Sequence, residues 1–376
     1  MSQPRFLVIA GLASSLVNFR GHLLNRIGER GYQVHAAAPG LEEDLATRAR
    51  LEAMGVICHS IPLERAGTNP VRDLGALVSL FRLMRRLRCQ GLLAYTVKPV
   101  VYGLLAGWMA RVPSRFALIT GLGYAFTGEA VGLRGRIQRL IRRFYRIALG
   151  RADRVFFQNP DDANLFAKLG IWGDVDRTTL VNGSGVDLEH FVRMPLPDPP
   201  IRFLLIARLL GDKGIREYAA AASAVRASEE RAEFHLVGGF DTNPDSLDRS
   251  ELDTWIRDGS VIWHGELDDV RPLLASCHVY VLPSYREGTP RTVLEAMGTG
   301  RAVITTNVPG CRETVTHGRN GLLVPARDAT SLADAMSELM NDQDRMAEMG
   351  CQSRVLAEER FDVHRVNDAM IAAMGI

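Results

Sequence analysis

The sequence contains few cysteines and no long uninterrupted apolar run. Its five cysteines lie far apart, with no Cys-x-x-Cys pair and no Cys/His ligand spacing, at Cys58, Cys89, Cys277, Cys311 and Cys351. That pattern argues against a zinc site or a disulfide framework and fits a reducing cytoplasm. The apolar run 99–110 is well below the ~18 residues of a spanning helix, and Gly11 breaks the stretch 6–19 into a strand, a turn and a helix. We therefore predict that the chain does not cross a membrane.

Length and composition indicate two soluble domains. The chain has 376 residues, more than the ~250–300 at which single hydrophobic cores stop growing. Hydrophobic residues make up 47% of it and charged residues 23%, as in ordinary globular proteins, so disorder and fibrous repeats are excluded.

A net charge of +2 hides an asymmetry between the two parts of the chain. Residues 1–195 contain 26 of the 45 Lys and Arg but only 15 of the 43 Asp and Glu, which gives them a charge of +11 and leaves −9 for the rest. The first part is therefore expected to bind something anionic.

Apolar, strand-length segments alternate with helical patterns in both halves. The strands are predicted at 5–10, 33–38, 56–61, 91–95, 116–120 and 154–158, and again at 202–208, 233–238, 261–265, 279–283 and 302–305. Strands without polar alternation that are separated by helices predict parallel sheets covered on both faces. The expected fold class is α/β, with two Rossmann-like doubly wound domains facing a central cleft in which ligands bind.

The boundary between the two domains is predicted from proline. RMPLPDPP, residues 193–200, has four prolines in eight residues, which neither a helix nor a central strand tolerates. We therefore predict a first domain at 1–192, a linker at 193–200, a second domain at 201–360, and a C-terminal helix at 361–376 that packs back on the first domain. No short repeat is found, so the two halves are expected to share their architecture only.

Two carboxylates flank a predicted helix start in EGTPRTVLE, residues 287–295. Glu287 follows the strand 279–283, Pro290 suits the first turn of a helix, and Glu295 falls inside that helix. Backbone N–H groups around Thr289–Val293 suit a diphosphate, and carboxylates accept hydrogen bonds from sugar and ribose hydroxyls. The plainer interpretation is a pair of solvated glutamates at a helix start.

Two basic residues follow the first strand of the second domain, in ARLLGDKG, residues 207–214. Arg208 and Lys213 lie at the carboxyl end of that strand, where open α/β sheets bind ligands. Their positive charges suit a leaving diphosphate, which they would stabilise as a metal ion otherwise does. In another context they would be ordinary surface residues.

These segments resemble the retaining family 4 glycosyltransferases of GT-B fold. The family's signature is two glutamates separated by seven residues, here 287–295, with an Arg…Lys-Gly element, here 207–214. The GVD motif in 182–191 and the segment 309–324 also match. Three further segments, 14–24, 95–110 and 119–128, resemble the bacterial branch that extends polyprenyl-diphosphate-linked sugars, including N-acetylgalactosaminyltransferases of protein N-glycosylation and relatives that make O-antigen or capsule.

The resemblance implies roles for particular residues. Catalytic roles fall to Glu287, Arg208 and Lys213, with Glu287 on the transferred sugar. Glu295 would hold the donor ribose. The implied donor-binding set is Gly11, Arg208, Lys213, Glu287, Gly288, Thr289, Pro290, Arg291, Thr292 and Glu295. The implied acceptor or sugar contacts are Asn18, Lys98, Thr120, Gly121 and Tyr124. Many family members have a histidine where this chain has Thr120, so the role of that histidine does not transfer intact.

The expected mechanism uses neither a metal nor a cofactor. No Ser–His–Asp or Cys–His arrangement is found, and the nine histidines are scattered. A strand histidine such as His35 or His235 is expected to be a packing residue. No Asp-x-Asp element ends a strand. The resemblance implies retention of anomeric configuration by same-face attack, with leaving-group stabilisation as the main catalytic contribution.

The segment 133–155 predicts an amphipathic helix rich in arginine. Apolar residues follow helical spacing at Ile137, Leu140, Ile141, Phe144 and Ala148, and Arg136, Arg139, Arg143 and Arg146 are expected on the other side. Such a helix suits an anionic membrane surface or a diphosphate. The alternative is a surface helix with its apolar side in the core. No nucleic-acid-binding motif accompanies the charge, so no nucleic-acid partner is expected.

These expectations combine into one predicted function. The first domain would bind the acceptor and the second the nucleotide sugar. The expected donor is a UDP-N-acetylhexosamine such as UDP-GalNAc. The acceptor would be an undecaprenyl-diphosphate-linked saccharide at the inner face of the bacterial membrane, with the protein peripheral and cytoplasmic. The alternatives are another donor such as GDP-mannose or UDP-galactose, a soluble acceptor, a nucleotide-sugar epimerase, and a sensor without turnover. The sequence leaves the oligomeric state open.

Overall fold

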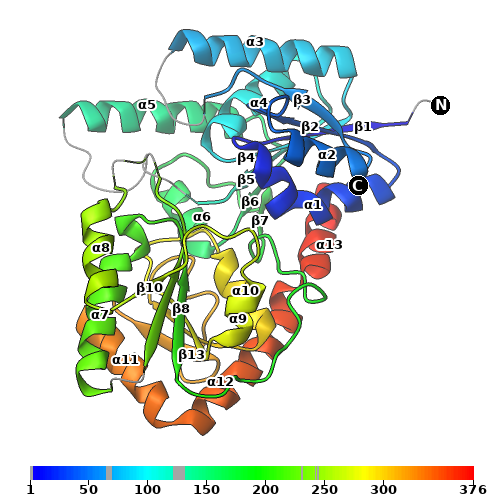
Figure 1. Ribbon diagram of the computed structural model, residues 1–376. Coiled ribbons are helices and arrows are strands. Elements are labelled where there is room, and N and C mark those ends of the chain that lie inside the picture. The colour runs from blue at the N-terminus through cyan, green and yellow to red at the C-terminus, as the bar shows by residue number, and fades with distance from the viewer. Residues whose placement is uncertain (1–2, 65–69, 122–131, 230–231, 242, 244) are drawn as a thin grey trace. The chain divides into compact units, whose positions relative to one another are not determined.

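The computed structural model describes residues 3–64, 70–121, 132–229, 232–241, 243 and 245–376 (Figure 1). The chain forms two compact units, one made of residues 1–184 and 364–376 and the other of residues 185–363. Each is a parallel α/β sheet with helices on both faces, which confirms the predicted fold class.

The sheet of the first unit has seven parallel strands in the order β3-β2-β1-β4-β5-β6-β7. They are β1 (Arg5–Ile9), β2 (Gln33–Ala38), β3 (Ile57–Ser60), β4 (Gly91–Tyr95), β5 (Ser114–Ile119), β6 (Arg154–Phe157) and β7 (Thr178–Leu180). Central strands such as β4 are buried throughout because helices cover both faces of the sheet.

Among the described residues of this unit, seven helices cover the sheet, in two layers. They are α1 (Ala13–Glu29), α2 (Leu45–Ala53), α3 (Pro70–Leu87), α4 (Val97–Met109), α5 (Gly132–Leu149), α6 (Pro160–Lys168) and α13 (Val363–Met374). Helices α3, α4, α5 and α6 share a core with one face of the sheet. Helices α1, α2 and α13 share a core with the other face. Side chains alternate along the strands, so β1 sends Leu7 to the first core and Phe6 to the second.

The second unit is a six-stranded parallel sheet in the order β10-β9-β8-β11-β12-β13. Its strands are β8 (Arg202–Ile206), β9 (Glu233–Val237), β10 (Ile262–Trp263), β11 (Val279–Leu282), β12 (Ala302–Thr306) and β13 (Gly321–Val324). Its helices are η1 (Gly211–Lys213), α7 (Ile215–Ser228), α8 (Arg249–Arg257), α9 (Arg271–Ser276), α10 (Arg291–Thr299), α11 (Ala329–Asn341), α12 (Gln343–Leu356) and the π-helical η2 (Ala357–Phe361). Helices α7, α8, α11 and α12 pack on one face, and α9, α10 and η2 pack on the other.

The chain passes from the first unit to the second at residues 184–185 and returns at 363–364. The proline-rich segment 193–200 lies within the second unit. Helix α13 belongs to the first unit, where Met370, Ile371 and Met374 are buried in the core beneath α1. An ion pair between Arg26 of α1 and Asp368 of α13, with Nε and Oδ1 2.7 Å apart, fixes the same contact at the surface.

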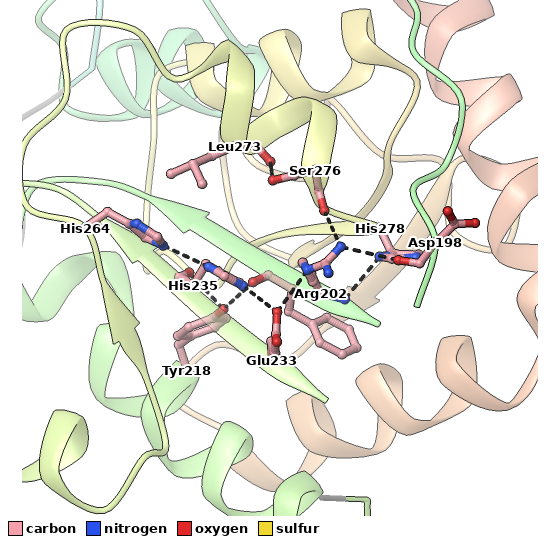
Figure 2. A network of polar contacts seen from close by, with 10 residues as sticks. Asp198, Arg202, Tyr218, Glu233, His235, His264, Leu273, Ser276 and His278 are labelled. Carbon is pink, nitrogen blue, oxygen red and sulfur yellow. Dashed lines mark hydrogen bonds and ion pairs between the residues drawn. The ribbon is translucent and has the colours of Figure 1, made fainter. Parts of the chain in front are cut away.

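The two halves also share a polar network, which corrects the expectation that only their architecture is alike. In the second unit, Arg202 of β8 donates to Glu233 of β9 at 2.9 Å, and Glu233 lies 3.3 Å from Nε2 of His235. His235 then meets His264, with Nδ1 and Nε2 2.8 Å apart and the rings stacked at 5.1 Å (Figure 2). His235 and His35, the strand histidines predicted to be packing residues, each lie in such a network.

The first unit repeats each step of this network at the matching strands. Arg5 of β1 donates to Gln33 of β2 at 3.1 Å, and Gln33 lies 3.3 Å from Nε2 of His35. His35 meets His59, with Nδ1 and Nε2 2.9 Å apart and the rings stacked at 5.1 Å. The one chemical difference along the series is Gln33 in place of a glutamate.

Within the described residues, no helix combines the length and the apolar character needed to cross a membrane.

Candidate active site

The predicted donor residues gather where the strand order of the second sheet reverses. Strands β8 and β11 are neighbours, but the chain continues from β8 toward β9 and from β11 toward β12. At such a switch point the loops after the two strands diverge and leave a crevice for a ligand. Arg208 and Lys213 follow β8, whereas Glu287 and the start of α10 follow β11.

Lys213 and Glu287 meet directly at this edge. The ammonium of Lys213 donates to Oε1 of Glu287, and the hydroxyl of Ser284 donates to the same oxygen at 2.8 Å. Only 17% and 16% of the Lys213 and Glu287 side chains are exposed. Burial lowers the pKa of Lys213, but the Glu287 carboxylate outweighs it and leaves that pKa above its ordinary value. The site therefore holds a charged amine paired with a carboxylate at the carboxyl edge of the sheet.

Two glycines bring the loops this close. Gly214 has φ of 71°, and a Cβ there would lie 2.1 Å from the carbonyl oxygen of Pro283, which directly follows β11. A Cβ on Gly310 would lie 2.1 Å from the carbonyl oxygen of Glu287, whose N–H donates to Pro309 at 3.0 Å. Any larger residue at either position would displace Lys213 or Glu287.

Arg208 lies at the same edge but does not join the Lys213–Glu287 pair. Its guanidinium forms an ion pair with Asp241, and 49% of its side chain is exposed. The Asp241 side chain is 16% exposed, but the half-exposed side chain of Arg208 is in contact with solvent. Arg208 is therefore able to turn to a bound anion.

Glu295 is the buried carboxylate of helix α10. Its side chain is 9% exposed, and Arg291, one turn earlier, donates from Nε to Oε1 at 2.8 Å. Burial raises the pKa of Glu295, and the Arg291 guanidinium opposes that rise. Thr292 accepts a hydrogen bond of 2.6 Å from the hydroxyl of Tyr280.

The remaining donor residues of the motif surround the start of α10. Pro290 is the N-cap residue with an extended backbone, rather than a member of the first turn, and Gly288 and Thr289 form the loop before it. The N–H groups of the first turn point out of the helix along its dipole. This end of α10 favours a bound anion.

The first unit has its own switch point, between β1 and β4. Gly11 follows β1, and a Cβ there would lie 2.9 Å from the hydroxyl oxygen of Thr96, which follows β4 with φ of 69°. That φ strains a non-glycine residue by about 1–3 kcal/mol. Lys98, in the first turn of α4, forms an ion pair with Asp73 of α3, with Nζ and Oδ1 2.7 Å apart.

The other predicted acceptor residues are more scattered. Asn18 is exposed on α1, and Thr120 and Gly121 follow β5. Tyr124 lies outside the described residues.

Helix α5 differs from the predicted division into an apolar side and an arginine side. Its buried residues include Tyr145, Ala148 and Leu149, whereas the predicted apolar residues Leu140 and Phe144 are exposed. The side chain of Ile137 lies outside the described set. Two of the predicted apolar residues, Ile141 and Ala148, do contact the core, so the buried stripe is displaced toward Tyr145 and Leu149 and leaves Leu140 and Phe144 outside it.

The exposed side of α5 therefore mixes charge with apolar surface. Arg136, Arg139 and Arg143 are exposed there beside Leu140 and Phe144. Arg146 is different, since its guanidinium donates to the carbonyl oxygen of Gly170, just after α6, and so ties α5 to that turn.

Three partners at these sites were not predicted from the sequence. They are Ser284, Asp241 and Asp73. Ser284 stands three residues before Glu287, so a turn between them is a local pattern that could have predicted their contact. Asp241 and Asp73 are 33 and 25 residues from the side chains that they pair with, and no local pattern links them.

Among the residues that the structure describes, no group of three or more His, Cys, Asp or Glu side chains is arranged to hold a metal ion.

Comparisons with known proteins match both halves of the chain. Residues 18–183 match the model of the glycosyl transferase 4-like domain, and residues 200–342 match that of glycosyl transferases group 1. The fold is that of GT-B glycosyltransferases: Anabaena HepE in complex with UDP has a TM-score of 0.76 at 18% identity over 99% of both chains. A sucrose-phosphate synthase from Thermosynechococcus elongatus has a TM-score of 0.77 at 19% identity over 98% of this chain and 97% of that one.

Curated relatives are similar over much of the chain. The N,N'-diacetylbacillosaminyl-diphospho-undecaprenol alpha-1,3-N-acetylgalactosaminyltransferase of Campylobacter jejuni is 28% identical over 90% of this chain and 89% of its own. The UDP-Gal:alpha-D-GlcNAc-diphosphoundecaprenol alpha-1,3-galactosyltransferase of Escherichia coli is 22% identical over 76% and 74%.

Two doubly wound sheets with charged side chains at a switch point are an arrangement in which open α/β sheets bind ligands. The chain belongs to the family 4 type of GT-B glycosyltransferases.

Proposed function

We propose that this enzyme transfers an N-acetylhexosamine, such as GalNAc, from a UDP-sugar to a saccharide linked to undecaprenyl diphosphate, in bacterial glycan or glycoprotein assembly. The relative from Campylobacter jejuni is named for that sugar and that kind of acceptor. The observation that carries the proposal is the Lys213–Glu287 pair at the switch point, beside the first turn of α10.

The proposed roles follow from the charges at this edge. Lys213 and Arg208 neutralise the donor diphosphate, and the first turn of α10 adds N–H groups and the positive end of its dipole. Glu287 contacts the hydroxyls of the transferred sugar. Glu295, which Arg291 holds in place, accepts from the ribose hydroxyls.

The proposed reaction retains the anomeric configuration. The bond between the anomeric carbon and the diphosphate oxygen breaks, and the acceptor oxygen bonds to the same face of that carbon. The departing phosphate oxygen takes the acceptor's proton. Stabilising the charge on the leaving diphosphate is then the main catalytic contribution. Since Lys213 and Arg208 supply that charge, we propose that no metal ion and no other cofactor is required.

The proposal places the enzyme at the inner face of the membrane, as a peripheral protein. Helix α5 supports this because Arg136, Arg139 and Arg143 stand beside exposed Leu140 and Phe144. Exposed arginines with apolar neighbours suit the boundary between lipid headgroups and chains. The acceptor's lipid chain would hold it at the same surface.

A donor screen tests the transfer reaction. Radiolabelled UDP-GalNAc, UDP-GlcNAc, UDP-galactose and GDP-mannose are each incubated with the protein and a bacterial lipid extract, and label in the organic phase is counted. We expect label from a UDP-N-acetylhexosamine, incorporated ~10²-fold or more slowly by Lys213→Ala. Label from UDP-galactose or GDP-mannose alone would contradict the proposed donor, since other relatives are named for these donors.

The same assay separates the other classes of function. Conversion of the donor to its epimer without any acceptor would indicate an epimerase. Binding of UDP-sugars without consumption, when every acceptor fraction has been supplied, would indicate a sensor. Transfer to water-soluble saccharides but not to lipid would indicate a soluble acceptor.

A further inference from the structure

Tyr285 lies in the loop between β11 and α10, two residues before Glu287. Its backbone N–H donates to the carbonyl oxygen of Asp212 at 2.8 Å, and its hydroxyl donates to Oε1 of Glu217 at 2.6 Å. Asp212 directly precedes Lys213, and Glu217 lies in the first turn of α7. Tyr285 therefore ties the loop that carries Glu287 to the chain on both sides of Lys213.

The hydrogen bond between Tyr285 and Glu217 has a fixed direction. Burial, followed by the Glu217 carboxylate, raises the pKa of Tyr285 to about 12, so the hydroxyl stays protonated at neutral pH and acts as the donor. The other carboxylate oxygen of Glu217, Oε2, is buried and has no hydrogen-bond partner within the described part of the chain. The carboxylate of Glu217 is therefore held through Tyr285.

A third loop reaches the aromatic ring of Tyr285. Arg327, in the loop after β13, places its guanidinium carbon 4.6 Å from the centre of the ring, within the range of a cation–π contact. Arg327 has φ of 61°, which a non-glycine residue adopts where its surroundings impose it. Tyr285 thus joins the segments that follow β8, β11 and β13 at the carboxyl edge of the second sheet.

The Lys213–Glu287 pair lies between these contacts. The ammonium of Lys213 donates to Oε1 of Glu287, so the two loops that Tyr285 joins each carry one member of the pair. Groups that stabilise a leaving diphosphate act best when they are already in place, and a displacement of about 1 Å can slow a reaction ~10²-fold. A residue that fixes both loops therefore acts on the reaction through this pair.

We propose that Tyr285 is a positioning residue for sugar transfer, which fixes Lys213 against Glu287 through its contacts with Asp212 and Glu217. The inference rests on the proposed function, because it is there that the pair acts on the donor. The role differs from a purely structural one, since it concerns the separation of an amine and a carboxylate rather than the stability of the fold.

The lysine content of the chain allows a test that needs no turnover. The three lysines are Lys98, Lys168 and Lys213. Burial lowers the pKa of the Lys213 amine, but the Glu287 carboxylate outweighs it; Asp212 adds to the rise and Arg208 opposes it. An amine is acetylated only when it is unprotonated. The full chain is therefore treated with trace acetic anhydride at pH 8, and label at Lys213 is compared by mass spectrometry with label at the exposed Lys168.

Tyr285→Phe removes the hydroxyl but keeps the ring that Arg327 contacts. We expect the labelling ratio to rise about threefold or more, because an amine that separates from its carboxylate has a lower pKa. The kcat for transfer should fall about tenfold or more, with a smaller change in KM for the donor, since the pair acts on charge that develops in the transition state.

Tyr218→Phe is the matched control, because it removes a hydroxyl from the same unit at a place away from the pair. The hydroxyl of Tyr218 donates to the carbonyl oxygens of Phe203 and His235 at 3.1 and 3.0 Å (Figure 2). Its loss should lower the melting temperature, since it leaves buried carbonyl groups without this donor. The labelling ratio and kcat should match the wild type.

The accepting side of the hydrogen bond gives a second test. Glu217→Gln keeps an oxygen that accepts from Tyr285 and should retain most of the rate. Glu217→Leu removes that oxygen and should match Tyr285→Phe in both labelling and kcat. The double variant Tyr285→Phe/Glu217→Leu should be no slower than either single variant, because both changes remove the same interaction.

The outcomes separate this inference from the proposed function. An unchanged labelling ratio in Tyr285→Phe, or an equal rise in Tyr218→Phe, would overturn the positioning role. If the wild-type protein transfers no sugar to any acceptor, the proposed function fails, while the labelling ratio still decides whether Tyr285 positions the pair. If transfer by the wild type is observed and Tyr285→Phe has the same kcat, the positioning role fails alone.

Discussion

Arg291 donates from Nε to Oε1 of Glu295 at 2.8 Å, one helical turn apart on α10, and so a guanidinium covers the buried carboxylate proposed to bind ribose. We predict that Arg291→Gln weakens UDP binding about tenfold at pH 6 and much less at pH 8. Burial raises the pKa of Glu295, and without Arg291 that pKa rises further. The carboxylate that accepts from the ribose hydroxyls is therefore protonated as the pH falls. Calorimetry with UDP at pH 6, 7 and 8 measures this. Arg291→Lys should restore most of the affinity, and a pH dependence identical to the wild type would refute the role.

Replacing the two glutamates of the motif should impair different steps, donor binding in one case and sugar transfer in the other. Glu295→Ala is expected to weaken UDP binding, whereas Glu287→Ala should leave UDP binding near normal and lower the rate of sugar transfer, with Glu287→Gln milder than Ala. Calorimetry with UDP and transfer assays with the active donor separate the two effects. Loss of UDP binding in Glu287→Ala together with normal binding in Glu295→Ala would reverse the assignments.

Removing either cation from the second unit's switch point should slow turnover. We predict that Arg208→Ala or Lys213→Ala lowers kcat by ~10²-fold or more, because each removes charge from the leaving diphosphate. Lys213→Ala also leaves Glu287 without its amine partner, so the melting temperature is the control for folding. EDTA should change the rate little; full loss in EDTA that magnesium or manganese restores would disprove the metal-free mechanism.

The exposed arginines of α5 should bring the protein to anionic lipid. Replacing Arg136, Arg139 and Arg143 with Gln should release it from anionic liposomes in sedimentation, since each basic residue near such a surface contributes about 1 kcal/mol. Arg146 is left in place because it holds the turn after α6. Replacing Arg50, Arg249 and Arg257 removes the same charge elsewhere and serves as the control. High salt should weaken wild-type binding, and activity on lipid-linked acceptors should fall more than on short soluble analogues. Sedimentation of the α5 variant equal to the wild type would rule out this role.

The paired histidines should make stability fall in acid. Burial, with contributions from His59 and Arg5, lowers the pKa of His35 from 6.5 to about 4. A group that is neutral when folded but protonated when unfolded contributes stability above pH 6.5, and that contribution falls as the pH drops toward 4. The full loss for His35 is roughly 3 kcal/mol. Urea unfolding at pH 7 and 5 measures the part of this loss that falls between those two pH values. His35→Gln/His59→Gln should reduce the pH dependence, while the exposed His190→Gln should not; no difference between the two variants would contradict this origin.

The sequence predicted the fold because its information is local. Apolar strand runs and the helices between them depend on neighbours along the chain, and the switch-point loops follow from strand order. It also placed Lys213 and Glu287 at one sheet edge. It did not predict that they pair, since 74 residues separate them and the contact depends on how two loops pack.

Side-chain partners beyond the motif were missed for the same reason. Arg146 was expected among the membrane residues because of its spacing, yet a carbonyl of a distant turn holds it. The repeated Arg–His network was missed because residues that carry it stand on adjacent strands, about 30 residues apart in sequence, and only strand register aligns them.

The return of the chain to the first unit at residue 364 sets an order for its completion during synthesis. Met370, Ile371 and Met374 belong to the core of the first unit, but the ribosome adds them after the 179 residues of the second unit. At ~5–20 residues per second that interval is roughly 10–40 s. Throughout it, the surface of α1 and the sheet that α13 later covers stays exposed to water. The domain made first is thus the last to be finished, and a nascent chain that stalls within the second unit carries an open apolar face that chaperones recognise.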